Sequence, residues 1–252
     1  MKTLTVDKLQ VKIMPNRTEM GEVAAADIHA KIKELLAVKE EINIIFAAAP
    51  SQNDVLQSLV DSDIEWNRVN AFHMDEYIGL DKSAPQGFGN FLNEHIFGKA
   101  PFKSVNYIDC EAADPEQECE RYAKLLEENP ADIIIMGIGE NGHIAFNDPW
   151  VADFKDTKKV KTVLLDEVCR QQQVNDGCFK ELSQVPKQAI TLTCPVFNEA
   201  PQLFCIVPAP TKAQAVKRTL CGAINEECPA TILREHEAAV LYLDADSSAL
   251  LG

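Results

Sequence analysis

The sequence predicts an α/β fold: a mostly parallel sheet covered by helices on both faces, and so built in three layers. Segments with helical periodicity alternate along the chain with short segments that are almost continuously apolar. Strands of that kind are typical of parallel sheets that are buried on both sides. The chain has 252 residues, 46% of them hydrophobic, which is enough for one sizeable core. We therefore expect residues 1–252 to form a single domain of this class.

The predicted elements follow from these two patterns. Residues 17–41 have apolar side chains at helical spacing, and 42–49 form the first apolar segment. Further strands are expected at 68–74, 131–138, 158–165, 189–193, 203–209 and 238–244, and further helices at 53–60, 87–99, 115–129, 211–220 and 246–251. Ligands of such sheets bind outside the carboxyl ends of the strands. A functional site is therefore expected in the residues that follow the strands.

The composition excludes two classes of partner. The chain has 39 acidic and 24 basic residues, a net charge of −15, and should repel nucleic acid and anionic lipid. It contains no apolar run of the roughly 18 residues that a membrane span needs. Its first residues, MKTLTVDKLQVKIMPN, lack the apolar segment of a signal peptide. We expect a cytoplasmic protein that binds neither nucleic acid nor membrane.

Eight cysteines lie at positions 110, 119, 169, 178, 194, 205, 221 and 228. No two of them have C-x-x-C spacing, and the chain is long for a disulfide scaffold. Reduced, buried, structural thiols are expected, and the spacing does not predict zinc.

The segment GIGENGHIAFNDP, residues 137–149, contains the pattern G-x-G-x-x-G after an apolar strand. A dinucleotide-binding turn needs a helix that begins at the third glycine. Here Gly142 is followed within seven residues by the turn signal N-D-P, so NAD binding is disfavoured. The glycines instead permit a loop that aims His143 and Asp148 into a crevice, with a solvated surface turn as the alternative.

The segment FHMDEYIGL, residues 72–80, has two adjacent carboxylates just past a strand. On an extended backbone, Asp75 and Glu76 point in opposite directions, so one can face the crevice while the other meets solvent or a backbone amide. A carboxylate in a partly dry pocket has a raised pKa and can act as a general base. The alternative is a polar strand end at which Asp75 caps a turn.

Two strand ends are candidate phosphate sites. In AAAPSQND, Ser51 and Asp54 match an S-x-x-D capping box, which predicts a helix start with free N–H groups. In VPAPTKAQAV, Thr211 is the predicted N-cap and Lys212 lies in the first turn. A lysine there opposes the helix dipole, which a bound anion would explain. An ordinary exposed lysine is the alternative.

In this order, the stretches FHMDEYIGL, GIGENGHIAFNDP, VPKQAITLT and VPAPTKA resemble the glucosamine-6-phosphate deaminase/isomerase family over nearly the whole chain. The related 6-phosphogluconolactonases usually continue their glycine loop with T-A-S-L-F-P, where this chain has IAFNDP. The resemblance implies a Rossmann-like sheet and conversion of a 2-amino-2-deoxyhexose 6-phosphate to fructose 6-phosphate and ammonia. It implies a sugar-phosphate substrate and neither a metal nor an organic cofactor.

The resemblance also implies roles for individual residues. Asp75 corresponds to the base that moves a proton between C2 and C1 of the open-chain sugar, and Glu76 to an adjacent carboxylate. His143 corresponds to the group that opens the ring, a task that suits an imidazole because its pKa lies near neutrality. Lys212 corresponds to a phosphate ligand, and Ser51 lies in the first phosphate loop.

The chain departs from the family pattern around His143. The family typically has a carboxylate where this chain has Asn141, and a glutamate where it has Asp148. An amide oxygen can orient an imidazole but cannot stabilise an imidazolium by its charge. Loss of such a carboxylate in a serine-protease triad costs about 10⁴ in kcat. We hypothesise that Glu140 supplies the missing charge, an idea that fails if Glu140→Gln leaves turnover intact.

The phosphate-binding stretches differ as well. The family's T-G-G-T-P is replaced by Ala48-Ala49-Pro50-Ser51-Gln52, and a proline has no N–H to donate. The remaining phosphate-site candidates are Gln52, Gly139, Gly142 and Arg170. KKVKT, residues 158–162, resembles a stretch that binds an allosteric sugar phosphate in some members. Because the chain ends soon after its last strand, allostery and a hexamer are not expected, while a homo-oligomer stays open.

Three hypotheses of different kinds remain. The first is an amino-sugar phosphate deaminase/isomerase acting on glucosamine 6-phosphate or an analogue such as galactosamine 6-phosphate. The second is a lactonase on a sugar-acid phosphate, which would also use His143. The third is a weakened enzyme that only binds a sugar phosphate, favoured by Asn141 and disfavoured by the retention of Asp75.

Overall fold

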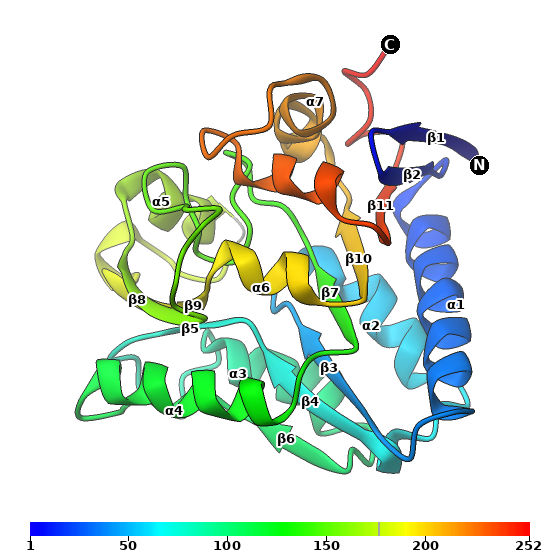
Figure 1. Ribbon diagram of the computed structural model, residues 1–252. Helices are drawn as coiled ribbons and strands as arrows, with labels where there is room; N and C mark the ends of the chain where they lie inside the picture. Colours follow the sequence, from blue (N-terminus) through cyan, green and yellow to red (C-terminus); the bar gives the residue numbers. More distant parts are fainter. Residues whose placement is uncertain (176) are drawn as a thin grey trace.

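A computed structural model of the protein describes residues 1–175 and 177–252. An eight-stranded sheet crosses the molecule (Figure 1). Its strands are β1 Lys2–Val6, β2 Leu9–Ile13, β3 Ile42–Phe46, β4 Val69–His73, β6 Ser104–Asn106, β7 Ile133–Met136, β10 Gln202–Val207 and β11 Ala239–Leu243. They are arranged in the order β1-β2-β11-β10-β7-β3-β4-β6. Neighbours from β2 onward are parallel, and β1 pairs antiparallel with β2.

A second, smaller sheet lies beside the first. It consists of β5 Asp75–Tyr77, β8 Val160–Leu164 and β9 Gln188–Leu192, paired antiparallel in the order β5-β9-β8. Since β5 begins two residues after β4 ends, the chain passes from one sheet to the other at the DEY sequence. This transition brings Asp75 to the edge where the parallel strands end.

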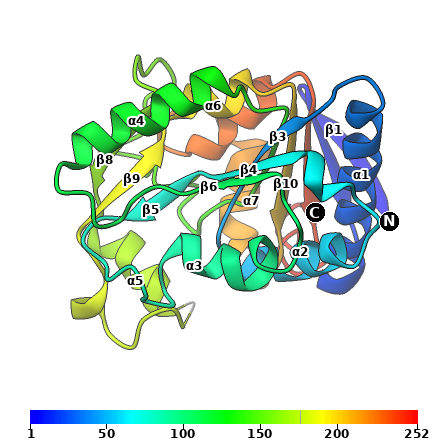
Figure 2. The ribbon, with the colours of Figure 1, turned by 90° about the horizontal axis from the view of Figure 1, so that it is seen from below.

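Helices cover both faces of the main sheet. They are α1 Arg17–Leu36, α2 Asn53–Val60, α3 Phe88–Leu92 with the π-helical turn Asn93–Phe97, α4 Pro115–Glu128, α5 Glu167–Asn175, α6 Cys194–Glu199 and α7 Ala213–Cys221. Figure 2 shows α2 and α3 on one side of the strands and α4 and α6 on the other. The predicted fold class, a mostly parallel sheet between two helical layers, is confirmed.

The two layers bury separate apolar cores. Ile28 and Ile32 of α1 pack with α2 and with one face of β3 and β4. On the other face, Tyr122 and Leu126 of α4 join residues of α6 and α7. Residues spaced at three or four positions along a helix lie on one face, so each helix presents one apolar stripe to the sheet. Burial of the strands on both faces explains why their sequences are almost continuously apolar.

Several parts of the predicted element list need correction, and β5, β6, α5 and α6 were not predicted. Residues 246–251 form turns rather than a helix, because Asp244 and Ser248 bond their side chains to nearby backbone groups, at 2.7 Å to Ser247 N and 2.8 Å to Asp244 O. The predicted helix at 87–99 is interrupted by the π-helical turn. The β1–β2 hairpin was not predicted; it turns at Asp7, whose φ is 53°.

All eight cysteines lie in the described part of the chain, and none forms a disulfide. Five of them are buried, as expected, whereas Cys110 and Cys178 are half-buried and Cys221 is exposed. Within residues 1–175 and 177–252, no helix combines the length and apolar character needed to cross a membrane.

Candidate active site

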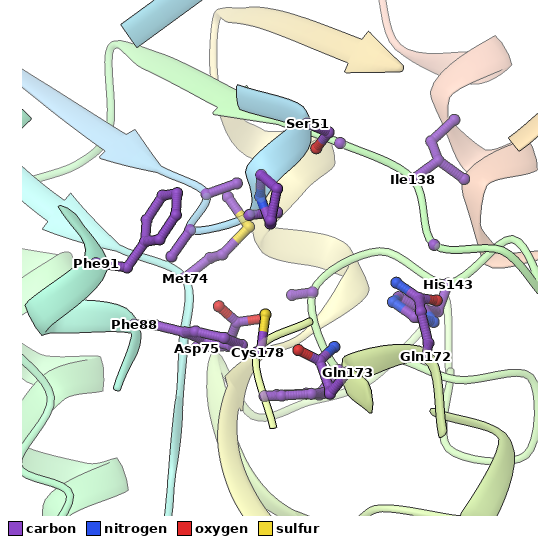
Figure 3. A pocket seen from close by; sticks show the side chains of 18 of the residues that line it. Ser51, Met74, Asp75, Phe88, Phe91, Ile138, His143, Gln172, Gln173 and Cys178 are labelled. Carbon is purple, nitrogen blue, oxygen red and sulfur yellow. The ribbon is translucent and has the colours of Figure 1, made fainter. Parts of the chain in front are cut away.

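A pocket of about 430 Å³ opens at the carboxyl ends of β3, β4, β7 and β10 (Figure 3). Its walls come from the segments that follow these strands, 47–51, 74–75, 137–139 and 208–212, completed by residues of α3 and α5. A volume of this size suits a small organic ligand. The expectation that the chemically dense segments meet at this edge of the sheet is confirmed.

The backbone of Asp75 is anchored by His73, the last residue of β4. Nε2 of His73 accepts a hydrogen bond from the N–H of Ile108 at 2.9 Å, so Nδ1 must carry the ring proton. Nδ1 then donates that proton to the backbone oxygen of Asp75 at 2.9 Å. Burial lowers the pKa of His73 to about 4, which keeps the ring neutral and preserves this arrangement near neutral pH.

The two adjacent carboxylates have separate environments. Asp75 lines the pocket, whereas Glu76 accepts hydrogen bonds from the backbone N–H groups of Tyr77, Phe88 and Gly89 at 2.9, 3.0 and 2.8 Å. The expected opposite orientation is confirmed. Burial, reinforced by the nearby charge of Glu76, raises the pKa of Asp75 well above its ordinary value. A raised pKa makes this carboxyl group a stronger base than an ordinary aspartate, as proton abstraction requires.

His143 enters the pocket from the loop that follows β7, and an amide and a carboxylate lie behind it. Asn141 donates its Nδ2–H to Asp148 Oδ1 at 2.8 Å, which turns Asn141 Oδ1 toward His143. That oxygen is 2.8 Å from His143 Nδ1 and must accept its proton. The chain Asp148–Asn141–His143 therefore sets the tautomer of the imidazole and leaves Nε2 able to accept a proton.

Asp148 is fully buried, and its Oδ1 is also 3.2 Å from His143 Nδ1. Burial raises the pKa of Asp148, but the hydrogen bond and charge of His143, with hydrogen bonds from Asn141 and the Cys169 thiol, outweigh burial and hold it below its ordinary value. A permanent negative charge thus lies in direct reach of the imidazole. The described hydrogen bond of Glu140 is made by its backbone N–H to Gln172 Oε1 at 3.1 Å, so its proposed electrostatic role stays a prediction.

Glycine is required in this loop for close packing. A Cβ at Gly139 would lie 2.1 Å from Cε1 of His143, so the imidazole occupies the space that a side chain would fill. Gly142 has a φ of 93°, and a Cβ there would lie 2.5 Å from Cys228 Sγ. Ala145, a pocket residue, has a φ of 47°, a strained value of the kind found at functional sites. No helix follows Gly142 before β8 in the described chain, which agrees with the rejection of a dinucleotide turn.

The phosphate-site candidates lie on two similar turns. Ser51 and Lys212 both line the pocket, each in a 3-10 turn, Pro50–Gln52 and Pro210–Lys212, that leads into a helix. Gln52 is fully buried behind Ser51 and donates its Nε2–H to Ser51 Oγ at 3.0 Å. With one lone pair of the oxygen engaged, the hydroxyl proton of Ser51 remains available for a ligand.

The predicted helix caps were wrong in detail. Neither Ser51 nor Thr211 is an N-cap, because the proline before each residue takes the first position of the turn and makes the preceding alanine the cap. Asp54 forms an ion pair with Arg17, 2.5 Å apart, rather than completing a capping box.

Comparison with known proteins agrees with this geometry. A family model described as glucosamine-6-phosphate isomerases/6-phosphogluconolactonase matches residues 15–242. The chain belongs to this family. It is 33% identical over 236 residues to the glucosamine-6-phosphate deaminase of Streptococcus gordonii, a match that covers 94% of this chain and 96% of the relative.

Solved structures of the family have the same fold. A monomeric glucosamine-6-phosphate deaminase superposes with a TM-score of 0.86 at 26% identity, covering 95% of this chain and 99% of the other. The 6-phosphogluconolactonase from Thermotoga maritima gives a TM-score of 0.77 at 21% identity, covering 94% and 100%. The second likeness shows the shared fold alone.

Arg170, a candidate phosphate ligand, does not line the pocket. The guanidinium of Arg170 donates to the backbone oxygens of Leu182, at 2.6 Å, and Val185, at 2.9 and 3.1 Å. It holds α5 against the segment that leads to β9 and is not an anion ligand here. The lysines of KKVKT are likewise engaged: Lys158, Lys159 and Lys161 pair with Glu116, Glu199 and Asp156 at 3.2, 2.6 and 2.8 Å.

Sequence reasoning missed the contribution of α5. Gln172, Gln173 and Cys178 line the pocket, as Figure 3 shows, and Cys169 lies next to Asp148 behind His143. The polar CRQQQV sequence has no apolar stripe from which a packed helix would be predicted. Its three consecutive glutamines match no motif used above. Side-chain amides can both donate to and accept from the hydroxyl groups of a ligand, so such a run could have indicated a binding segment.

Proposed function

We propose that this protein converts glucosamine 6-phosphate, or a close analogue such as galactosamine 6-phosphate, into a ketohexose 6-phosphate and ammonia. The observation that carries the proposal is that Asp75, with a raised pKa, and His143, with a defined tautomer, line the same pocket. Family membership and the names of its relatives support the same reaction. Within the proposal, residues 1–252 act as one cytoplasmic domain whose partner is the sugar phosphate.

Ring opening is the first step, and His143 is the group suited to it. Because Nδ1 donates to Asn141, Nε2 is free to take the proton of the C1 hydroxyl and pass it to the ring oxygen. The C1 aldehyde and the C5 hydroxyl form as the C1–O5 bond breaks. Asp148 stabilises the transient imidazolium by its charge, at 3.2 Å from Nδ1.

Proton transfer between carbons is the second step, and Asp75 is its base. The carboxylate removes the C2 proton and returns it at C1. A second proton passes from the amine nitrogen to the C1 oxygen, so that the aldehyde becomes a hydroxymethyl group and the C2 amine becomes an imine. Water then adds at C2 and ammonia leaves, so one water is consumed and one ammonia released. Glu76 contributes indirectly, since its charge raises the pKa of Asp75.

Substrate binding is assigned to the turns that carry Ser51 and Lys212. Lys212 supplies the permanent positive charge among the described pocket residues, and the Ser51 hydroxyl, oriented by Gln52, donates to the phosphate. Gly139 and Gly142 contribute indirectly, because they leave room for the His143 imidazole and for Cys228. No step of this scheme uses a metal or an organic cofactor.

The test is a product assay with purified protein. With glucosamine 6-phosphate we expect equal amounts of ammonia and fructose 6-phosphate, and Asp75→Asn should lower kcat by about 10²–10⁴, the usual contribution of acid–base catalysis. Asp246→Asn, an exposed aspartate near the C-terminus, is the matched control and should not change kcat. Absence of ammonia release by the wild-type protein contradicts the proposal.

A second candidate, hydrolysis of a phosphorylated sugar lactone, is favoured by the fold shared with 6-phosphogluconolactonases. In that case His143 would activate water and Asp75 would have no proton to move. Turnover of 6-phosphogluconolactone that survives Asp75→Asn, with no ammonia from amino sugars, would select this function.

A further inference from the structure

A compact set of metal-ligand types lies behind the imidazole of His143. One ligand atom from each of His143, Asp148 and Cys169 lies within 4.8 Å of the other two, and all three residues are buried. His143 and Asp148 come from the loop after β7, whereas Cys169 comes from α5, so two separate segments form the group. The reaction described above makes no use of the Cys169 thiol.

The separations suit a tetrahedral ion. Zinc bonds to nitrogen and oxygen are about 2.0–2.2 Å long, which places two such ligand atoms roughly 3.4 Å apart in a tetrahedral site. His143 Nδ1 and Asp148 Oδ1 are 3.2 Å apart. Asn141 Oδ1, 2.8 Å from His143 Nδ1, is a further oxygen on the same side of the ring.

A second observation points to a ligand at this place. Asp148 is 0% exposed, yet its Oδ2 receives no hydrogen bond from a nitrogen or oxygen donor of the described residues. The neighbouring Cys169 thiol is a weak donor that cannot match the hydrogen bonds a buried carboxylate oxygen usually receives. A cation bound through both carboxylate oxygens of Asp148 would satisfy Oδ2.

We propose that His143, Asp148 and Cys169 form a zinc site and that the bound ion inhibits the enzyme. Mixed nitrogen, oxygen and sulfur donors select zinc over magnesium or calcium, which take oxygen ligands. On binding, the Cys169 thiol loses its proton to solvent and forms the Zn–S bond. The imidazole proton moves from Nδ1 to Nε2 as Nδ1 forms the Zn–N bond.

Inhibition follows from this change of tautomer. With Nδ1 bound to zinc, Nε2 keeps its proton and cannot accept one from the sugar, so ring opening is blocked. Zinc binding itself does not depend on the proposed function, whereas the inhibition rests on the role proposed for His143. The two parts are therefore measured separately.

Binding is tested with cobalt as a spectroscopic substitute for zinc. The full-length protein is freed of metal with EDTA, dialysed and titrated with Co²⁺. We expect one ion per chain, with a sulfur-to-cobalt charge-transfer band in the near ultraviolet and visible bands of a tetrahedral site, and displacement of both by Zn²⁺. Cys169→Ser should abolish the charge-transfer band, while Cys221→Ser, which changes an exposed thiol, should retain it.

Asp148→Asn provides a second variant, independent of the thiol. It should weaken Zn²⁺ binding by more than the roughly 10–100-fold that loss of an outer partner of a metal ligand costs. Absence of a thiolate band in the wild type, or a band that persists in Cys169→Ser, overturns the site. If Cys169→Ser does not fold, unchanged Zn²⁺ affinity in Asp148→Asn overturns it.

Inhibition is tested in the product assay. Ammonia release by the wild type should fall as Zn²⁺ saturates the site and recover when EDTA is added, with the same response in Cys221→Ser. Full activity with zinc bound overturns the inhibitory role and leaves the site intact. Absence of any ammonia release without zinc contradicts the proposed function instead, while the cobalt result still decides the site.

Discussion

Asp75, at the start of β5, and Asp148, on the loop after β7, are buried aspartates of the same site, and their environments have opposite effects. Asp75 meets apolar surroundings and a second carboxylate, which raise its pKa. Asp148 meets an imidazole and an amide donor, which lower its pKa despite burial. Position in the pocket, not residue type, thus decides which carboxyl group exchanges protons and which remains charged.

The difference assigns two distinct tasks. A proton carrier works best with a pKa closer to the working pH than that of an ordinary aspartate, and burial and the charge of Glu76 raise the pKa of Asp75 in that direction. A charge that stabilises an imidazolium must not take up protons itself, and the donors around Asp148 ensure this. Because Asp148 retains its charge, an amide at position 141 is compatible with this arrangement. Asn141 donates to Asp148 and accepts from His143, so the carboxylate orients the imidazole through the amide.

Among the variants that test the difference between Asp75 and Asp148, Gly139→Ala is expected to have the largest effect on activity. The new Cβ would overlap the ring of His143, which has three atoms between 2.1 and 2.4 Å from it, and would displace the imidazole from Asp148. We expect kcat to fall by about 10²–10⁴, the usual contribution of acid–base catalysis. Gly87→Ala is the control, since its Cβ would meet the nearest atom at 3.3 Å. Steady-state kinetics that show equal activity for the two variants would contradict the assigned geometry.

Asn141→Asp should make the surroundings of Asp148 resemble those of Asp75. It replaces the Nδ2–H that lies 2.8 Å from Asp148 Oδ1 by a carboxylate oxygen, and two carboxylates this close share a proton. We expect kcat/KM to fall on the order of 10-fold, a part of the roughly 10²–10⁴ that acid–base catalysis supplies. The exposed Asn198→Asp controls for added charge. A gain in activity would show that the amide limits the rate.

His73→Gln tests the anchor on the Asp75 side through stability. The pKa of His73 is lowered from its ordinary value of 6.5 to about 4 in the folded protein. Between these two pH values the unfolded chain therefore protonates His73, whereas the folded protein keeps it neutral. The stabilisation by neutral His73 is complete above pH 6.5 and is lost as the pH falls toward 4, by about 3 kcal/mol in total. Urea unfolding should show the wild-type advantage shrinking over this range; a constant advantage would contradict the neutral ring.

The sequence predicts most of the fold because apolar strands and amphipathic helices carry strong periodic signals. The edge strand β1, the adjacent strand β2 and the polar helix α5 escape prediction, since their side chains alternate less clearly or face the pocket. At 246–251 the apolar pattern predicts a helix, but side-chain hydrogen bonds from Asp244 and Ser248 favour turns.

Prediction of the site succeeds where a short motif lies just after a strand. Asp75, His143, Ser51 and Lys212 all reach the pocket, because strand ends converge at one edge of a parallel sheet. Arg170 could not be placed from the sequence, since one helix turn decides whether it faces the pocket or the backbone of residues 182–185. The proximity of Cys169 to Asp148 depends on how α5 packs and has no signal in cysteine spacing.

The most direct test of the central claim compares the melting temperatures of Asp75→Asn and Asp148→Asn with wild type as a function of pH. A raised pKa makes the charged Asp75 costly above its ordinary value of 3.8, so Asp75→Asn should raise the melting temperature at pH 8. A lowered pKa makes charged Asp148 stabilising above that value, so Asp148→Asn should lower the melting temperature. The Asp75 difference should diminish as the pH falls toward 3.8, whereas the Asp148 difference should persist down to about that pH and diminish only below it. Shifts of the same sign at pH 8 would contradict the opposite roles of the two aspartates.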